Sequence, residues 1–74
     1  MGFERNKNFL IAFGKRLKQL RKEKNISQAQ LAFEADVQIS QISRIERGLI
    51  NTTIANAHLL AKILDVPTKS LFDF

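Results

Sequence analysis

The sequence predicts an all-α protein that folds as one compact domain. A chain of 74 residues supports only a thin hydrophobic core, because proteins of this size bury only about 60% of their unfolded surface. Hydrophobic residues make up 45% of the chain and charged residues 26%, which is a normal globular composition. The apolar residues recur every three or four positions, and no segment shows the period of two that a half-buried strand requires.

The first helix is expected from about residue 8 to residue 24. Its apolar face is formed by residues three or four positions apart, namely Phe9, Phe13, Leu17 and Leu20. Basic side chains fill the other faces, so the helix is amphipathic. Residues 1–8 are expected to be an N-terminal extension, and residues 9–74 to form the folded domain.

A second, shorter helix is predicted over about residues 28–35. Ser27 precedes it as the N-cap, and Gln30, three residues later, completes a capping box. Asp36 follows the helix and tolerates the left-handed backbone conformation that a tight turn needs.

Three further helical segments follow. A third helix from about residue 39 to residue 47 stops at Gly48, a common residue just after a helix C-terminus. Thr52 or Thr53 can cap a fourth helix, and residues 68–72 can form one or two last turns. The predicted core consists of Phe13, Leu17, Leu20, Leu31, Ile42, Ile45, Ile54, Leu60 and Leu64.

The composition excludes several kinds of site. The chain has no Cys, which excludes disulfides and thiolate zinc sites, and its one histidine, His58, cannot form a histidine cluster. We therefore expect a protein that is not an enzyme and that uses no metal or cofactor. The longest apolar run, residues 9–13, is too short for a membrane span or a secretory signal, so a cytoplasmic location is expected.

The charge is distributed unevenly along the chain. The formal net charge is +5. Residues 1–24 contain eight basic and two acidic side chains, whereas residues 25–74 contain four and five. An excess of positive charge is typical of proteins that bind nucleic acid or an anionic membrane surface, although a basic helix face can also serve solubility alone.

The predicted third helix has two chemically different faces. At about 100° per residue, one arc that must face the core contains Ile42, Ile45, Glu46 and Leu49. The opposite arc contains hydroxyl and guanidinium groups and one aliphatic, with an amide at its border: Ile39, Ser40, Ser43, Arg44, Arg47 and Gln41. In protein–DNA complexes arginine pairs with guanine, glutamine with adenine, and aliphatic groups with the thymine methyl. A plain solvated face usually carries Lys and Glu in pairs, and this face has no Lys.

Two motifs at this point resemble those of a known family. Residues 27–32 (Ser-Gln-Ala-Gln-Leu-Ala) are followed by residues 42–48 (Ile-Ser-Arg-Ile-Glu-Arg-Gly), and then by Leu-Asp-Val-Pro and Leu-Phe near the C-terminus. Over roughly residues 9–72 the chain thus resembles the lambda-repressor-like (XRE/Cro) helix-turn-helix family. The resemblance implies a compact five-helix DNA-binding domain with its helix-turn-helix at about residues 28–47. It also implies a homodimer on a palindromic operator, with the third helix in the major groove.

The resemblance implies which residues contact bases. Ile39, Ser40 and Arg44 match the family's base-contacting positions, and Gln38 and Gln41 complete the expected set. The family favours Ser or Thr where this chain has Gln38, which is a poor N-cap. Either the helix starts a residue or two later, capped by Ser40, or Gln38 contacts DNA.

Other matched positions lie near the DNA backbone or in the interior. Gln28, Ser43 and Arg47 match positions near phosphates, and Lys15 and Arg16 are expected to approach flanking phosphates.

Arg21 and Glu46 match a buried ion pair that links the first helix to the third. This match agrees with the inward position of Glu46, because a buried carboxylate needs a partner. The family usually has glycine where Asp36 stands, and we expect the turn to survive this substitution.

The sequence therefore predicts a sequence-specific double-stranded DNA-binding transcriptional regulator, expected to be a repressor or autoregulator that joins the nucleoid when bound. A homodimer is expected, with Leu71, Phe72 and Phe74 at the C-terminal end as its apolar surface. One alternative is a protein-interaction module, such as an antitoxin component that acts mainly through a toxin or another partner protein. Another is a membrane-surface helix. A phage or restriction-modification controller, an antitoxin and a stand-alone regulator all fit the sequence equally.

Overall fold

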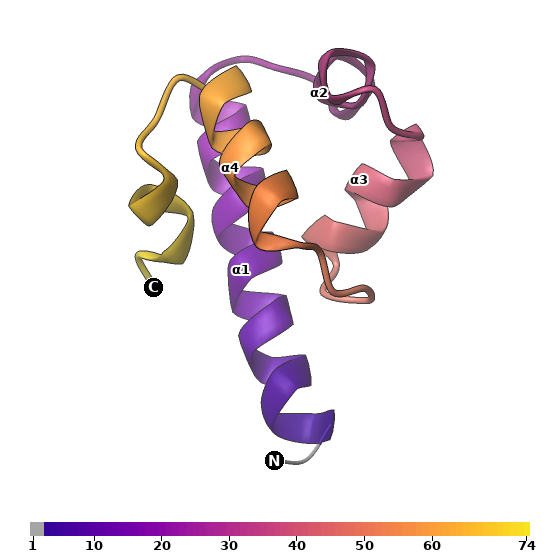
Figure 1. Cartoon of the computed structure of the whole chain (residues 1–74), viewed down its shortest axis with the longest axis vertical. Coiled ribbons are helices and arrows are strands. Elements are labelled where there is room, and N and C mark those ends of the chain that lie inside the picture. The colour runs from indigo at the N-terminus through magenta and orange to yellow at the C-terminus, as the bar shows by residue number, and fades with distance from the viewer. Residues whose placement is uncertain (1–2) are drawn as a thin grey trace.

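A computed structural model describes residues 3–74 of the chain, and it is all-α, as predicted. Its elements are α1 (Phe3–Glu23), α2 (Gln28–Ala35), α3 (Ile39–Glu46), α4 (Ile54–Ile63) and the 3₁₀-helix η1 (Thr68–Phe72). The described residues contain no strand. α1 is the long central element, with α2 and α3 on one side of it and η1 on the other (Figure 1).

The expectation of five helices is wrong in one respect, because the fifth element is a 3₁₀-helix. It spans only five residues after Pro67, which is too short for α-helical hydrogen bonds to offset the cost of nucleation. Instead, the Ser70 N–H donates to the Pro67 carbonyl at 2.9 Å, the three-residue spacing of a 3₁₀ turn.

The first helix also begins earlier than predicted, at Phe3 rather than near residue 8. Residues 3–7 contain Glu, Arg and Lys, which are good helix formers, and no proline. Residues 1 and 2 of the expected N-terminal extension lie outside the described residues.

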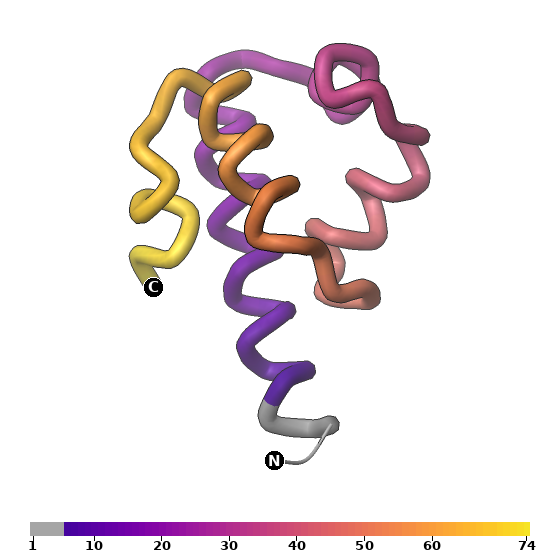
Figure 2. Tube along the Cα trace, viewed as in Figure 1, coloured from indigo at the N-terminus to yellow at the C-terminus, as the bar shows by residue number. Residues whose placement is uncertain are grey.

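Each α-helix is followed, within two residues, by a residue with left-handed backbone conformation. The four residues have φ between 57° and 74° and are Asn25, Asp36, Gly48 and Asp65. After Asp36, for example, the Val37 N–H donates to the Ala32 carbonyl at 3.0 Å, which closes a Schellman motif. The turn predicted at Asp36 is therefore confirmed. These compact ends let the chain change direction between consecutive helices (Figure 2).

Two of the predicted N-caps are present. The Ser27 hydroxyl accepts a hydrogen bond from the Gln30 N–H at 3.0 Å at the start of α2. Of the two candidate threonines before α4, Thr53 is the cap, and its hydroxyl accepts from the Asn56 N–H at 3.0 Å. Each cap satisfies one backbone donor that the helix itself leaves unpaired.

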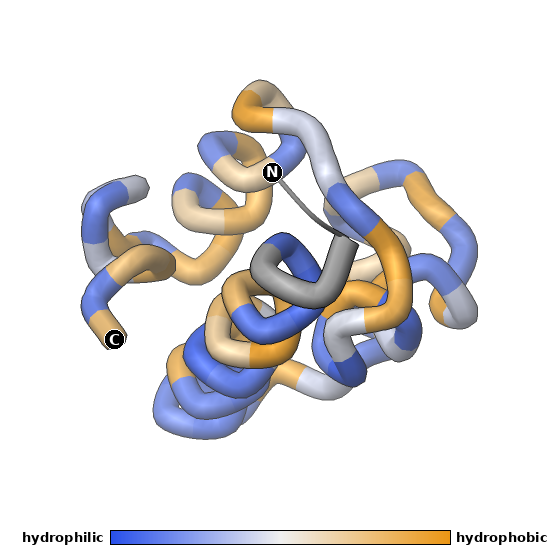
Figure 3. Tube along the Cα trace, turned by 90° about the horizontal axis from the view of Figure 1, so that it is seen from below, coloured by the Kyte–Doolittle hydropathy of each residue, from blue (hydrophilic) through white to orange (hydrophobic). Residues whose placement is uncertain are grey.

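The core receives side chains from all five elements. Its fully buried large residues are Leu17, Leu31, Ile42, Leu64 and Leu71. Figure 3, which looks along α1, shows apolar and polar residues alternating around that helix.

Two residues expected to face the core do not. Ile54 is 85% exposed because it is the first residue of α4, beyond the packed part of the stripe. Leu49 is 58% exposed because α3 has already ended at Glu46.

Candidate nucleic-acid interface

α2 and α3 form a helix-turn-helix, and α3 presents an exposed polar face. The two helices pack against each other and are joined by residues 36–38. On α3, Ile42, Ile45 and Glu46 are buried. The exposed residues on and beside α3 are Gln38, Ile39, Ser40, Arg44 and Arg47, and Ser43 is half-buried. These residues separate along the two arcs that the sequence predicted.

Gln38 lies at the N-terminal end of this face. α3 begins at Ile39, so Gln38 occupies the N-cap position with φ −71° and ψ 145°. The alternative start capped by Ser40 is therefore wrong. Within the described part of the chain the Gln38 side chain makes no capping hydrogen bond, and it is exposed beside Ile39.

Arg21 and Glu46 form a buried ion pair between α1 and the C-terminal end of α3. Arg21 Nε lies 2.6 Å from Glu46 Oε2, and Nη2 lies 2.9 Å from Oε1. The Nη1 group donates to the Ile26 carbonyl at 2.9 Å. The hydrogen bond to Glu46 raises the pKa of the Arg21 guanidinium, against the opposing effect of burial, and the carboxylate charge raises it further. Arg21 is therefore charged, and its charge offsets that of Glu46.

Gln28 brings α2 into the same contact. Its Nε2 donates to Glu46 Oε1 at 2.9 Å, so α1, α2 and α3 meet at one carboxylate. The predicted role of Gln28 was a phosphate contact. One amide N–H is used inside the domain, while the half-buried side chain keeps a second N–H.

Two glycines allow α1 and the end of α3 to approach closely. A Cβ on Gly14 would press against the Ile45 carbonyl oxygen and lie 2.5 Å from that of Glu46. A Cβ on Gly48, where φ is +74°, would lie 2.6 Å from the Ile11 side chain. Sequence reasoning missed Gly14, although an isolated glycine inside a helical pattern often marks a close contact.

The two basic residues predicted to approach phosphates from α1 have different surroundings. Lys15 is exposed. Arg16 is half-buried, and its Nε donates to the Ser70 carbonyl at 2.7 Å. Its Nη1 donates to Gln19 at 3.1 Å, and its Nη2 lies 4.0 Å from an Asp73 carboxylate oxygen. Arg16 of α1 thus forms hydrogen-bond and ionic contacts with η1 and the residue that follows it.

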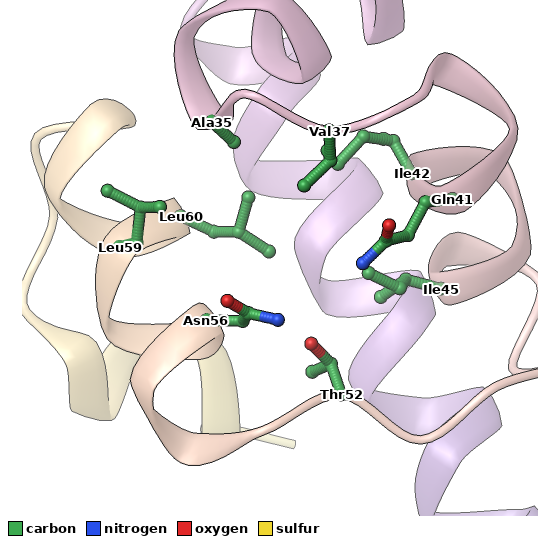
Figure 4. A pocket seen from close by; sticks show the side chains of 9 residues that line it. All are labelled: Ala35, Val37, Gln41, Ile42, Ile45, Thr52, Asn56, Leu59 and Leu60. Carbon is green, nitrogen blue, oxygen red and sulfur yellow. The ribbon is translucent and has the colours of Figure 1, made fainter.

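Gln41 is also placed differently from the exposed residues of α3. Its side chain is half-buried and lines a small cavity between α3 and α4. In Figure 4 its amide points toward Thr52 and Asn56 inside that cavity.

An aromatic cluster covers the other side of α1. Phe9 lies 6.3 Å from Phe72 and 5.4 Å from Phe74 between ring centroids, and Phe13 lies 5.2 Å from Phe72. Phe9, Phe72 and Phe74 remain 41–55% exposed. Leu71 was expected on this surface, and that expectation is wrong: its exposure is 0%, because η1 directs it into the core.

His58 is exposed, and its Nδ1 lies 2.8 Å from the Thr68 hydroxyl. Among residues 3–74, no three His, Cys, Asp or Glu side chains gather in a way that could hold a metal ion. None of the helices in this part of the chain is both long and apolar enough to span a membrane.

The chain is similar in sequence to a known family and to a characterised control protein. A family model described as helix-turn-helix matches residues 17–71. The control protein C.BamHI of Bacillus amyloliquefaciens is 43% identical over 68 residues, covering 90% of this chain and 84% of the relative.

Two solved structures are similar in both fold and sequence. The restriction-modification controller protein C.AhdI of Aeromonas hydrophila superimposes with a TM-score of 0.82 at 40% identity, over 85% of this chain and 96% of that one. The biofilm regulator SinR, solved in complex with DNA, superimposes with a TM-score of 0.76 at 42% identity, over 82% of this chain and 98% of the SinR chain in that structure. Against the full SinR of Bacillus subtilis, the match covers only 55% of the relative.

Proposed function

This chain belongs to the lambda-repressor-like helix-turn-helix family, and from that membership we propose that it is a DNA-binding transcriptional regulator whose recognition helix is α3. The similarity to SinR, a transcriptional regulator solved with DNA, supports this function.

The observation that carries the proposal is the chemistry of the exposed face of α3. This face holds hydroxyl, amide and guanidinium groups, and Arg44 is exposed near its middle. Glu46 is the only acidic residue of α3, and it is buried against Arg21. The face therefore presents no carboxylate that would repel phosphates.

Base contacts are assigned to the residues that are exposed at the N-terminal end and middle of α3. These are Gln38, Ile39, Ser40 and Arg44. Arg44 can donate two hydrogen bonds to a guanine, and Ile39 can contact a thymine methyl group.

Phosphate contacts are assigned to Ser43, Arg47 and Lys15, and to the second amide N–H of Gln28. Arg16 is left out of the interface because its guanidinium already contacts the carbonyl of Ser70. These contacts would set affinity and orientation, whereas the base contacts would set sequence preference.

The assembly we propose is a homodimer on a palindromic operator. The exposed rings of Phe9, Phe72 and Phe74 form an apolar surface that a second copy can cover. Two copies of α3 would then enter major grooves about 34 Å apart, one helical turn of DNA.

Among the roles left open by the sequence, we propose that of a restriction-modification controller acting as a repressor or autoregulator. The support is that C.BamHI and C.AhdI match this chain over 84% and 96% of their own lengths. Such a regulator would work in the cytoplasm, on the nucleoid when bound, and without catalytic activity.

Selection of binding sites from a randomised duplex library tests the proposal. We expect a palindromic consensus with wild-type protein. Arg44→Ala should weaken binding to that site by about 1–3 kcal/mol and relax preference at one base. Arg47→Ala is the matched control, and it should weaken binding equally on all sequences. If wild-type protein selects no consensus, the alternative of a protein-interaction module takes precedence.

A further inference from the structure

A small cavity of about 10 Å³, partly open to solvent, lies between α2, α3 and α4. Most of its lining is apolar, including Ile42 and Leu60. Three polar side chains also reach it from different places: Gln41 from α3, Thr52 from the connection before α4, and Asn56 from α4. Figure 4 shows their polar ends pointing toward the same space.

The hydroxyl of Thr52 lacks a hydrogen-bond partner at this cavity among the described residues. Its Oγ1 is buried and, within residues 3–74, has no hydrogen-bond partner. Nearly all buried polar atoms in native proteins have a partner, either a protein group or an ordered water, because an unpaired one forfeits its hydration. Thr52 does not use its hydroxyl as the helix cap, since Thr53 has that role.

The cavity has the size and the polar groups to hold a water molecule that hydrogen-bonds to the Thr52 hydroxyl. A volume of this order holds one water molecule, and a buried water typically makes two to four hydrogen bonds. The two amides can donate or accept, and the Thr52 hydroxyl can do either. We propose that one ordered water occupies the cavity and is shared by Thr52, Gln41 and Asn56.

This water would add a polar connection between α3 and α4. The backbone of α3 lies close mainly to α1 and α2, while side chains of α3 and α4 line the cavity together. Through the water, Gln41 links α3 to Asn56 of α4 and to the loop that precedes it. Gln41 is therefore a positioning residue of the recognition helix and not a base contact, a step that rests on the proposed function.

The water itself is tested by a crystal structure at high resolution and by Thr52→Val, which keeps the side-chain shape but removes the hydroxyl. We expect density within hydrogen-bond distance of Thr52 Oγ1 and of at least one amide. Thr52→Val should lower the melting temperature by about 4–8 °C, and Thr52→Ser, which retains the hydroxyl, should lower it less. An empty cavity, or a Val variant as stable as wild type, would overturn the proposal.

The role of Gln41 is tested by pairing it with Thr52. If the water is shared, the melting-temperature losses of Gln41→Met and Thr52→Val should be less than additive when the two are combined. Gln41→Met should also select the same consensus as wild-type protein. A changed preference at a single base would overturn the positioning role and make Gln41 a base contact. If wild-type protein selects no consensus, the proposed function as a DNA-binding regulator is refuted. The crystal structure and the melting temperatures would still show whether the water is present.

Discussion

Removal of the Arg21 side chain should destabilise the protein strongly while leaving its sequence preference unchanged. In Arg21→Ala, Glu46 loses the two guanidinium contacts at 2.6 and 2.9 Å and stays buried, while Gln28 still donates to it. Breaking one side of a buried ion pair costs about 3–5 kcal/mol. A domain of 74 residues has a total stability of only about 4–11 kcal/mol. The loss corresponds to a melting temperature lower by about 12–40 °C.

The assay is thermal unfolding followed by circular dichroism, with Lys22→Ala as the matched control. Lys22 is the next residue of α1, is exposed, and carries the same charge. Its removal should change the stability by no more than about 0.5 kcal/mol. The reasoning is refuted if the two variants melt together.

Substitutions at three further positions test the packing and the assembly. Gly14→Ala should lower stability by about 1–3 kcal/mol, because the new methyl group meets backbone atoms of α3; a rise of about 1 kcal/mol in chemical denaturation, the helix-propensity gain alone, would contradict the close contact. Asp36→Gly should raise the unfolding free energy by up to about 1 kcal/mol, since φ is 57° there, and Asp36→Ala should lower it in the same urea titration. Phe74→Ser should weaken the proposed dimer in sedimentation experiments and leave the fold intact, because Phe74 is 55% exposed; an unchanged association constant would place the interface elsewhere.

The features that sequence predicted well are those set by a few neighbouring residues. Ser27 caps α2, and Asp36 takes the left-handed conformation, because both depend on local hydrogen bonds and backbone geometry. The exposed face of α3 was also predictable, since helical periodicity separates Arg44 from Ile42 and Ile45. Resemblance to the family added the pairing of Arg21 with Glu46, which the two sequence positions alone do not reveal.

The features that sequence missed depend on where one element ends or what packs against it. Leu49 was assigned to the buried arc by extending a helix that has already ended at Glu46. Gln41 lies at the border of the two arcs, and only the position of α4 decides which way its amide points. Gly14 faces α3 across a tertiary contact that has no local signal beyond the glycine itself.

The two ends of α3 have different roles, which explains why stability and specificity should separate in these variants. With eight residues, α3 is too short to be stable alone, so tertiary contacts must hold it. Ile42 packs into the core from the middle of α3, and the polar and close backbone contacts gather at the C-terminal end, where Glu46 meets Arg21 and the backbone passes Gly14. The N-terminal end, with Gln38 and Ile39, is exposed and holds no such contact. Substitutions at the exposed end can therefore change the preferred DNA sequence at little cost in folding, whereas those at the anchored end unfold the domain before they change what it binds.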